Sequence, residues 1–343
     1  MSDTNETPAR EPTPERPEIP GLRDQILDTY GRLWELETWL RQLVYVELRA
    51  LLGDTWASII RGTEGPREKD KRLTHMPTAE KTPLSYAQFS ELCRIISEKW
   101  ELFEHFLPPK SIWEAKLEEI TQVRNRVAHF RKGHRDDLSR VVQLLRDIDH
   151  GFWRFCASYN DPQPVLPAAD DPVVAHFLDL DPFPWSLLGN GKWARGGMAD
   201  PAARLGVTVE VLCRPWASWH IPVAGNVGLI YDVTVSARQQ RALDYRRLLE
   251  DTSAVHAHVV HICLDSFAQM VRLTIPAVIG GSDVIRIIGR FIEVSRYCMH
   301  GSSGQDISAS IQALANEWPE YVCGPENPLG FLAPDMPCRF FGV

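Results

Sequence analysis

Apolar side chains recur at steps of three and four positions between residues 22 and 51. The residues that follow this spacing are Leu22, Ile26, Leu33, Leu36, Leu40, Leu43, Val44 and Leu51. An α-helix turns once in about 3.6 residues, so this spacing places all of them on one face of a single helix. The sequence therefore predicts a long helix with one buried face that ends near Gly53.

A second helix is predicted over residues 84–107, with Ser85 as its N-cap. Pro108 and Pro109 end it, because proline cannot continue a helix. Between the first two helices, residues 61–83 are rich in Lys, Arg, Gly and Pro and show no period. This composition predicts a mildly basic surface loop.

Two more helices follow. Ser111 and Glu114 match a capping box, in which a serine and a carboxylate three residues later satisfy free backbone amides, so a helix begins there and runs to about residue 130. Gly133 ends that helix, and Asp136 caps the next one. The apolar face of this last helix comprises Leu138, Val141, Val142, Leu145, Ile148, Phe152 and Phe155. Four helices with short connections predict an all-α bundle.

The rest of the chain has a different composition. Residues 1–20 hold five prolines and are predicted to be a disordered tail, the bundle spans residues 21–160, and four prolines in residues 161–172 mark a linker. The remaining residues, 173–343, are predicted to form a mixed α/β or α+β sensor or regulatory domain. Its predicted strands are residues 208–213, 229–235, 255–264 and 271–275, its predicted helices are residues 237–250, 283–297 and 307–318, and an extended tail starts at residue 325.

The seven cysteines form no CxxC pair and have no metal-ligand spacing, so we expect reduced thiols. The sequence shows no cationic and apolar leader at its start and no apolar run of about 18 residues. We therefore expect a cytoplasmic protein without a membrane partner.

The segment with the most chemical potential is residues 121–135. The chain carries a formal charge of −8, yet this segment holds five basic residues and two histidines, and no acidic residue lies between Glu119 and Asp136. It is the strongest local positive charge in the sequence, and such a patch is how an acidic protein can contact nucleic acid.

Arg124 occupies a position where a leucine is expected. Trp113, Leu117, Ile120, Arg124 and Val127 follow one another at helical steps, so Arg124 lies on the apolar face of its helix. A buried guanidinium costs several kcal/mol unless it is paired, so such a residue marks either a functional site or an ion pair with a carboxylate of the first helix. The candidate carboxylates are Glu35, Glu37 and Glu47.

Arg124 and His129 are five positions apart and diverge by about 140° around an ideal helix. Two copies of the helix facing each other across a twofold axis would bring an arginine and a histidine into one groove. These residue types suit RNA cleavage without a metal, because a histidine exchanges protons near neutral pH and an arginine stabilises charge on phosphate oxygens. Asn125 would orient the histidine or donate to a phosphate oxygen.

The run Arg124-Asn125-Arg126-Val127-Ala128-His129 in the third helix of a bundle resembles the Arg-Asn-x-x-x-His signature of the HEPN superfamily. Residues 33–41 also resemble the long first helix of that branch, and the resemblance covers residues 21–159. It implies a homodimeric ribonuclease of a toxin or antiviral (abortive-infection) system, with Arg124, Asn125 and His129 as the catalytic residues and no metal or other cofactor. Charge alone assigns Arg126, Arg131, Lys132, His134 and Arg135 to RNA binding.

Several alternatives stay open at this point. Some HEPN domains have lost activity, which would leave a silent module that binds RNA or a nucleotide or braces a dimer, and the aromatic-rich second domain would suit a partner-docking protein. The sequence does not specify whether the RNA substrate is tRNA or mRNA. It also does not specify whether an antitoxin or a trigger ligand acts through the C-terminal domain. His256, His258 and His261 are predicted to lie in one strand as core or edge residues, with a metal site as the minor alternative.

Overall fold

The computed structural model describes residues 24–76, 80–160, 170–196, 200, 202–218, 223–332 and 339–343. The predicted disordered tail, most of the predicted linker and Cys338 lie outside these residues. Among the described residues, no helix is both long and apolar enough to cross a membrane.

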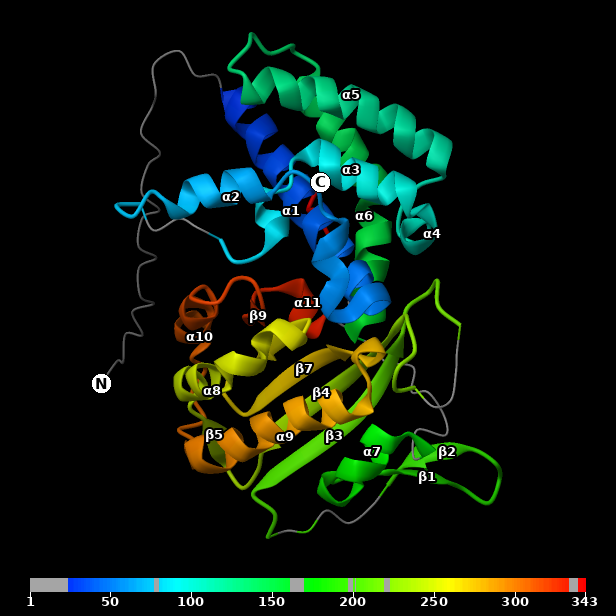
Figure 1. Cartoon of the computed structure of the whole chain (residues 1–343), viewed down its shortest axis with the longest axis vertical. Coiled ribbons are helices and arrows are strands. Elements are labelled where there is room, and N and C mark those ends of the chain that lie inside the picture. Colours follow the sequence, from blue (N-terminus) through cyan, green and yellow to red (C-terminus); the bar gives the residue numbers. More distant parts are fainter. Residues whose placement is uncertain are drawn as a thin grey trace, which may run out of the picture.

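The N-terminal part is helical (Figure 1). Its elements are α1 (Asp24–Leu52), η1 (Gly53–Ile59), α2 (Glu64–Lys71), η2 (Pro83–Tyr86), α3 (Phe89–Glu98), α4 (Trp100–Phe103), α5 (Lys110–Ala128) and α6 (Asp137–Asn160). Helix α1 packs against α3, α5 and α6, because its leucines at three- and four-residue steps are buried together. The predicted long first helix is confirmed.

Three details of the helical prediction are wrong. The predicted loop 61–83 contains α2, whose residues are all at least partly exposed and so produce no apolar period. The predicted helix 84–107 is divided into η2, α3 and α4, because the backbone is extended at Ala87 and Gln88 and leaves the helical region again at Lys99. Neither Ser85 nor the Ser111 capping box is used: α3 follows Gln88 and α5 follows Pro109, and neither helix has a side-chain cap.

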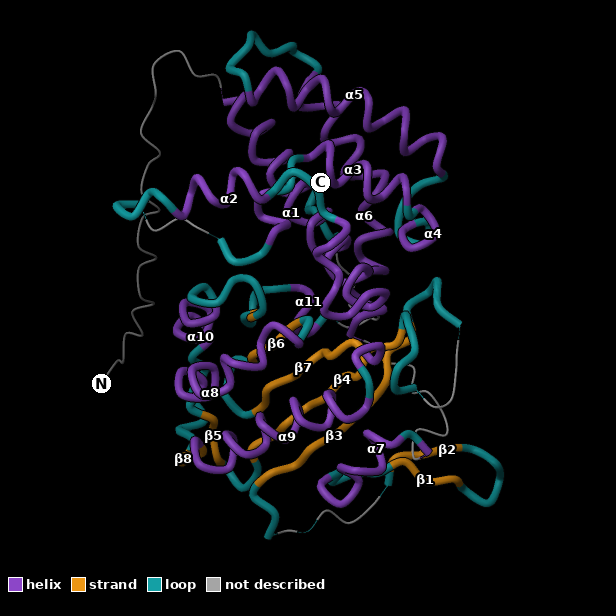
Figure 2. The backbone as a smooth tube through the Cα atoms, viewed as in Figure 1, coloured by secondary structure: helices purple, strands orange, loops and turns teal. Residues whose placement is uncertain are grey.

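The C-terminal part combines sheets and helices, which confirms the predicted fold class (Figure 2). Its helical elements are α7 (Pro172–Phe177), η4 (Leu178–Leu180), α8 (Tyr245–Thr252), η5 (Ser253–His258), η6 (Ala277–Ile279), α9 (Gly281–Cys298), α10 (Ser308–Ala315) and α11 (Pro328–Phe331). Its strands are β1 (Trp185–Leu187), β2 (Trp193–Arg195), β3 (Leu205–Cys213), β4 (Leu229–Ala237), β5 (Arg241–Leu243), β6 (His261–Leu264), β7 (Met270–Pro276), β8 (Met299–Gly301) and β9 (Val322–Cys323).

Five strands form the main sheet in the order β3-β4-β7-β6-β9. All neighbours are antiparallel except β6 and β9, which are parallel. One face of the sheet packs with α7, α8 and α9 around a core of valine, leucine and isoleucine. Two predictions here are wrong: residues 237–250 contain β5 and only a short helix, and residues 255–264 begin as the 3₁₀ helix η5 rather than as a strand.

The other face of the sheet packs on the N-terminal helices. Leu212, Ile230, Val260 and Cys263 belong to the same buried apolar cluster as the leucines of α1 and the phenylalanines of α6. The two parts of the chain therefore share a core.

A fully buried ion pair crosses this shared core. Arg214 directly follows β3, and its side chain donates to both carboxylate oxygens of Glu47 on α1. Its Nη2 lies 2.6 Å from Glu47 Oε1, and its Nε lies 3.1 Å from Oε1 and 3.2 Å from Oε2. Trp216 Nε1 donates to the same carboxylate at 2.7 Å. Because a buried charge is tolerated only when it is paired and hydrogen-bonded, this cluster fixes how the sheet sits on α1.

The C-terminal tail was predicted to be extended from residue 325, but it contains α11 and then returns to the N-terminal helices. Phe341 is buried against Phe152 of α6, and Phe340 packs edge-on against Trp39 of α1. The Phe341 amide donates to Asp149, and its carbonyl accepts from Arg32.

Candidate functional site

The candidate site lies at the C-terminal end of α5. The helix ends at Ala128, and His129 is its C-cap. The Arg131 amide donates to the Arg126 carbonyl at 2.9 Å and the Phe130 amide to the Val127 carbonyl at 3.2 Å, which is the Schellman pattern. Phe130 has the left-handed conformation that this pattern requires, with φ of 52°, so it occupies the place that was predicted for Gly133.

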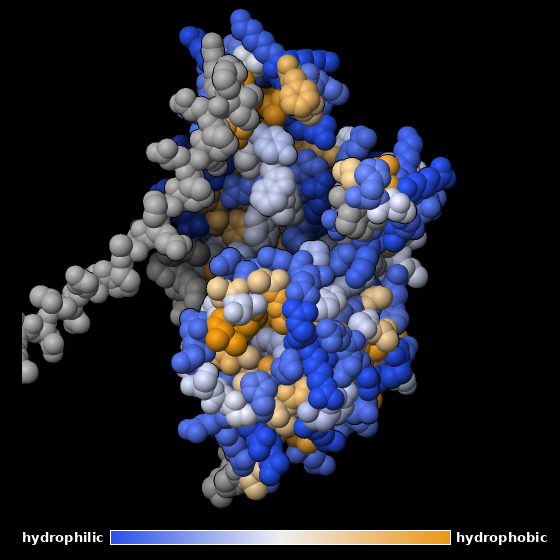
Figure 3. Space-filling model, turned by 90° about the vertical axis from the view of Figure 1, so that its left-hand side faces the viewer, coloured by the Kyte–Doolittle hydropathy of each residue, from blue (hydrophilic) through white to orange (hydrophobic). Residues whose placement is uncertain are grey.

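Arg124 lines a groove of about 610 Å³ between α1, the end of α5 and the segment before α3. Figure 3 shows the hollowed face of the molecule, with the N-terminal helices above and the C-terminal domain below. The three carboxylates proposed as partners are engaged elsewhere: Glu35 with Arg32, Glu37 with Arg41, and Glu47 with Arg214. Within the described part of the chain, the Arg124 side chain forms no hydrogen bond or ion pair.

His129 is exposed beyond the last turn of α5, and its backbone amide donates to the carbonyl of the half-buried Asn125. The groove is lined by Arg124, Val127 and Ala128 but not by Asn125 or His129. In the described part of the chain, neither this groove nor the neighbouring cavity beside the start of α1 is lined by both Arg124 and His129.

Arg126 forms an ion pair that joins α5 to α6. Its Nε donates to Asp137 Oδ2 at 3.1 Å, and a second guanidinium nitrogen donates to Oδ1. The His134 amide also donates to this carboxylate at 2.8 Å. Burial opposes ionisation of Asp137, but the hydrogen bonds from Arg126 and His134 outweigh it and lower the pKa of the carboxyl. Arg126 thus holds the turn that carries the other basic residues.

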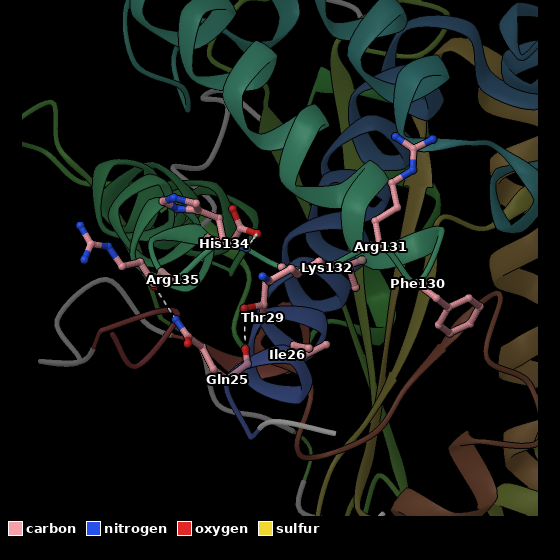
Figure 4. A pocket seen from close by; sticks show the side chains of 11 residues that line it. Gln25, Ile26, Thr29, Phe130, Arg131, Lys132, His134 and Arg135 are labelled. Carbon is pink, nitrogen blue, oxygen red and sulfur yellow. Dashed lines mark hydrogen bonds between the residues drawn. The ribbon is translucent and has the colours of Figure 1, made fainter. Parts of the chain in front are cut away.

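The remaining predicted RNA-binding residues gather around a second cavity of about 370 Å³ beside the start of α1. In Figure 4, Lys132 lies between Phe130 on one side and His134 and Arg135 on the other, and Gln25 of α1 donates to the Arg135 carbonyl. This cavity and the Arg124 groove share Val127 as a lining residue, so they flank the same turn of α5. Arg131, Lys132, His134 and Arg135 therefore form one exposed basic rim.

Three aromatic residues near the site were not predicted as functional. Tyr30 and Trp34 of α1 line the groove with 59% and 61% of their surface exposed, and Phe130 is 97% exposed. The sequence signal for the first two was their place on the polar side of an otherwise leucine-faced helix. The signal for Phe130 is conformational and is not visible in a sequence.

The three histidines singled out in the second domain do not share a strand. His256 and His258 lie in η5, where they contact Thr252 and Asp54, and only His261 is in β6, where it contacts Tyr159. Among the described residues, no group of three or more His, Cys, Asp or Glu side chains is placed to hold a metal ion. These contacts assign the histidines to packing within the fold.

Comparison with protein families bears on the helical part of the chain. A family model described as Swt1-like HEPN matches residues 33–149, from the third turn of α1 to the middle of α6. The N-terminal half of this chain carries a HEPN domain. No curated protein and no solved structure matches the chain. The HEPN match includes Arg124, Asn125 and His129, whereas the domain that contains the five-stranded sheet lies outside it. HEPN domains are often ribonucleases, and others bind nucleotides.

Proposed function

We propose that this protein is a metal-independent endoribonuclease that acts as a homodimer, with Arg124 of one copy and His129 of the other at each composite site. The supporting observation is that Arg124 lines the groove of a HEPN domain and forms no hydrogen bond or ion pair with any residue that the structure describes. A guanidinium that forms no ion pair with a described carboxylate is suited to hold a phosphate.

The reaction needs only protein groups. The His129 imidazole takes the proton of a ribose 2'-hydroxyl, and that oxygen attacks the adjacent phosphorus. Arg124 stabilises the charge that accumulates on the non-bridging oxygens, and Asn125 assists by hydrogen bonding. The bond from phosphorus to the 5'-oxygen then breaks, the leaving oxygen takes a proton from water, and His129 returns its proton to the solvent. The products are a 2',3'-cyclic phosphate and a free 5'-hydroxyl.

The basic rim of Arg131, Lys132, His134 and Arg135 would hold the RNA backbone, and Arg126 would support it from its ion pair with Asp137. Such an enzyme must be restrained in its own cell. A role as a toxin or antiviral effector therefore includes an antitoxin or a trigger ligand that acts through the C-terminal domain.

The test is to sequence RNA ends in cells after brief induction of the wild type and of His129→Ala. We expect new 5'-hydroxyl ends at defined positions in the wild type alone, because the variant lacks the proton acceptor. His300→Ala, an exposed histidine of β8, is the matched control and should cleave as the wild type does. Equal cleavage by a folded His129→Ala protein would exclude this mechanism.

A second candidate follows from the separation of Arg124 and His129 within one chain. If no dimer joins them, the domain is a catalytically silent module that binds RNA or a nucleotide. This candidate predicts retention of RNA without cyclic-phosphate ends, including in purified protein incubated with RNA in EDTA. The nuclease, in contrast, should continue to cleave in EDTA.

A further inference from the structure

The groove beside Arg124 presents two aromatic rings to solvent. Tyr30 and Trp34 are four residues apart and therefore lie on the same side of α1, and both line the groove with more than half of their surface exposed. Large aromatic side chains normally bury this surface. Two arginines and three glutamates, Glu37, Glu80 and Glu320, line the same groove. Exposed aromatic faces are the usual platform for unpaired nucleobases.

The two arginines that line the groove, Arg41 and Arg124, differ in their partners. Arg41 is engaged by Glu37 and by the backbone carbonyls of Leu84 and Ala87. Arg124 has no such partner in the described part of the chain, which leaves it as the cation available to a phosphate. A nucleotide whose base stacks on Trp34 can thus place its phosphate at Arg124. The volume of about 610 Å³ lies within the range of pockets that hold small ligands.

The C-terminal domain supplies one wall of this groove. Pro319 and Glu320, which follow α10, line it opposite the HEPN domain. Glu320 Oε1 accepts from the Lys81 amide at 3.3 Å, and Glu320 Oε2 has no hydrogen-bond partner among the described residues. A carboxylate accepts hydrogen bonds only, so it favours a base edge that carries N–H donors. Guanine offers two adjacent donors, its N1–H and its 2-amino group.

We propose that Tyr30, Trp34 and Glu320 form a base-binding subsite for an unpaired guanine of the RNA, with Arg124 at its phosphate. The subsite rests on the proposed ribonuclease function and makes the C-terminal domain a determinant of substrate choice. In the proposed dimer the second copy brings its His129 to Arg124, and the RNA occupies the rest of the groove. The space is concave and walled by the C-terminal domain, and charged residues line it, whereas the centre of a protein interface is depleted of charge.

The test measures binding without cleavage. The probes are fluorescently labelled 2'-O-methyl pentanucleotides UUGUU, UUIUU and UUUUU, in which the methyl group blocks the attacking oxygen and inosine lacks the 2-amino group. We expect the wild type to bind UUGUU most tightly. Trp34→Ala should weaken that binding about tenfold or more, and Trp34→Phe should restore most of it, because stacking needs a ring. Phe267→Ala removes another exposed aromatic side chain that does not line the groove, and it should not change binding.

The wild type should prefer the guanine probe to the inosine probe, and Glu320→Gln should remove this preference. The neutral amide of glutamine no longer favours the N1–H and 2-amino donors of guanine together. Unchanged binding by Trp34→Ala overturns the subsite. So does a shift from dimer to monomer in sedimentation of Trp34→Ala with RNA binding retained, because that result would assign the Trp34 ring to the contact between the two copies. If the wild type does not cleave RNA while Trp34→Ala binds the probes more weakly than the wild type, the nuclease proposal fails and the subsite stands.

Discussion

At the scale of single residues, the two buried histidines of the C-terminal domain couple stability to pH. Burial lowers the pKa of His261 to about 3, with Arg272 and Arg49 adding to the effect, and burial with Lys81 lowers that of His256 to about 4. His261 Nδ1 lies 2.9 Å from the Tyr159 hydroxyl, and His256 Nε2 lies 2.9 Å from the Thr252 hydroxyl. Both side chains are therefore neutral in the folded protein at any pH near neutrality.

The sign of the resulting pH dependence follows from proton binding. Below about pH 6.5 the unfolded chain protonates these histidines and the folded chain does not, so the free energy of unfolding falls as the pH falls. At pH 5 the loss is about 2 kcal/mol for each histidine. Urea unfolding at pH 7 and pH 5 measures it. His261→Gln, which keeps hydrogen-bonding groups but does not titrate, should lose less stability between these pH values, and His300→Gln should behave as the wild type. An undiminished pH effect in His261→Gln would show that another group is responsible.

At the scale of elements, the end of α5 combines a favoured hydrogen-bond pattern with an unfavoured residue. Phe130 holds the left-handed position of a Schellman motif, where glycine is usual, because the side chain of any other residue crowds the backbone there. We predict that Phe130→Gly raises the free energy of unfolding by about 1 kcal/mol. Thermal denaturation measures the change. Phe130→Ala retains the crowded β-carbon, so its stability should equal that of the wild type. A destabilised Phe130→Gly protein would contradict the conformational argument.

Which elements the sequence predicted depends on how much of each is buried. α5, α6 and the first part of α1 each bury one face, so their leucines and aromatics repeat at helical steps. From Leu43 to Ala50 every residue of α1 is buried, because the sheet packs there as well. Helix α2 has no buried residue and left no such pattern. The Val- and His-containing run that became η5 and β6 is apolar in either conformation, and periodicity does not separate a short buried strand from a short buried helix.

The candidate site was likewise predicted only where the signal is local in the sequence. Arg124 was predicted because it interrupts an apolar face within its own helix, a signal that is local in sequence. Its surroundings were not predicted, because Trp34 and Glu320 reach the same groove from opposite ends of the chain. That proximity depends on how the sheet docks on the helices, which no local pattern encodes.

At the scale of the whole molecule, the last described residues complete the core of the first helices. Phe341 is 3% exposed and packs against Phe152 and Phe340. We predict that Phe341→Ala lowers the free energy of unfolding by about 3–5 kcal/mol, the usual loss for a buried phenylalanine. Urea unfolding measures the change, and Arg339→Ala, at an exposed position in the same segment, is the control. A loss below about 1 kcal/mol would mean that the segment does not stay docked.

The contact between Phe341 and Asp149 joins positions 192 residues apart. A ribosome adds about 5–20 residues per second, so α6 leaves the ribosome roughly 10–40 seconds before the segment that closes its apolar surface. During that interval the nascent helices expose the site of Phe341 and the faces that later meet the sheet. The order of synthesis therefore delays completion of the N-terminal core, and with it the proposed RNA-cleaving dimer, until nearly all of the described chain has been translated.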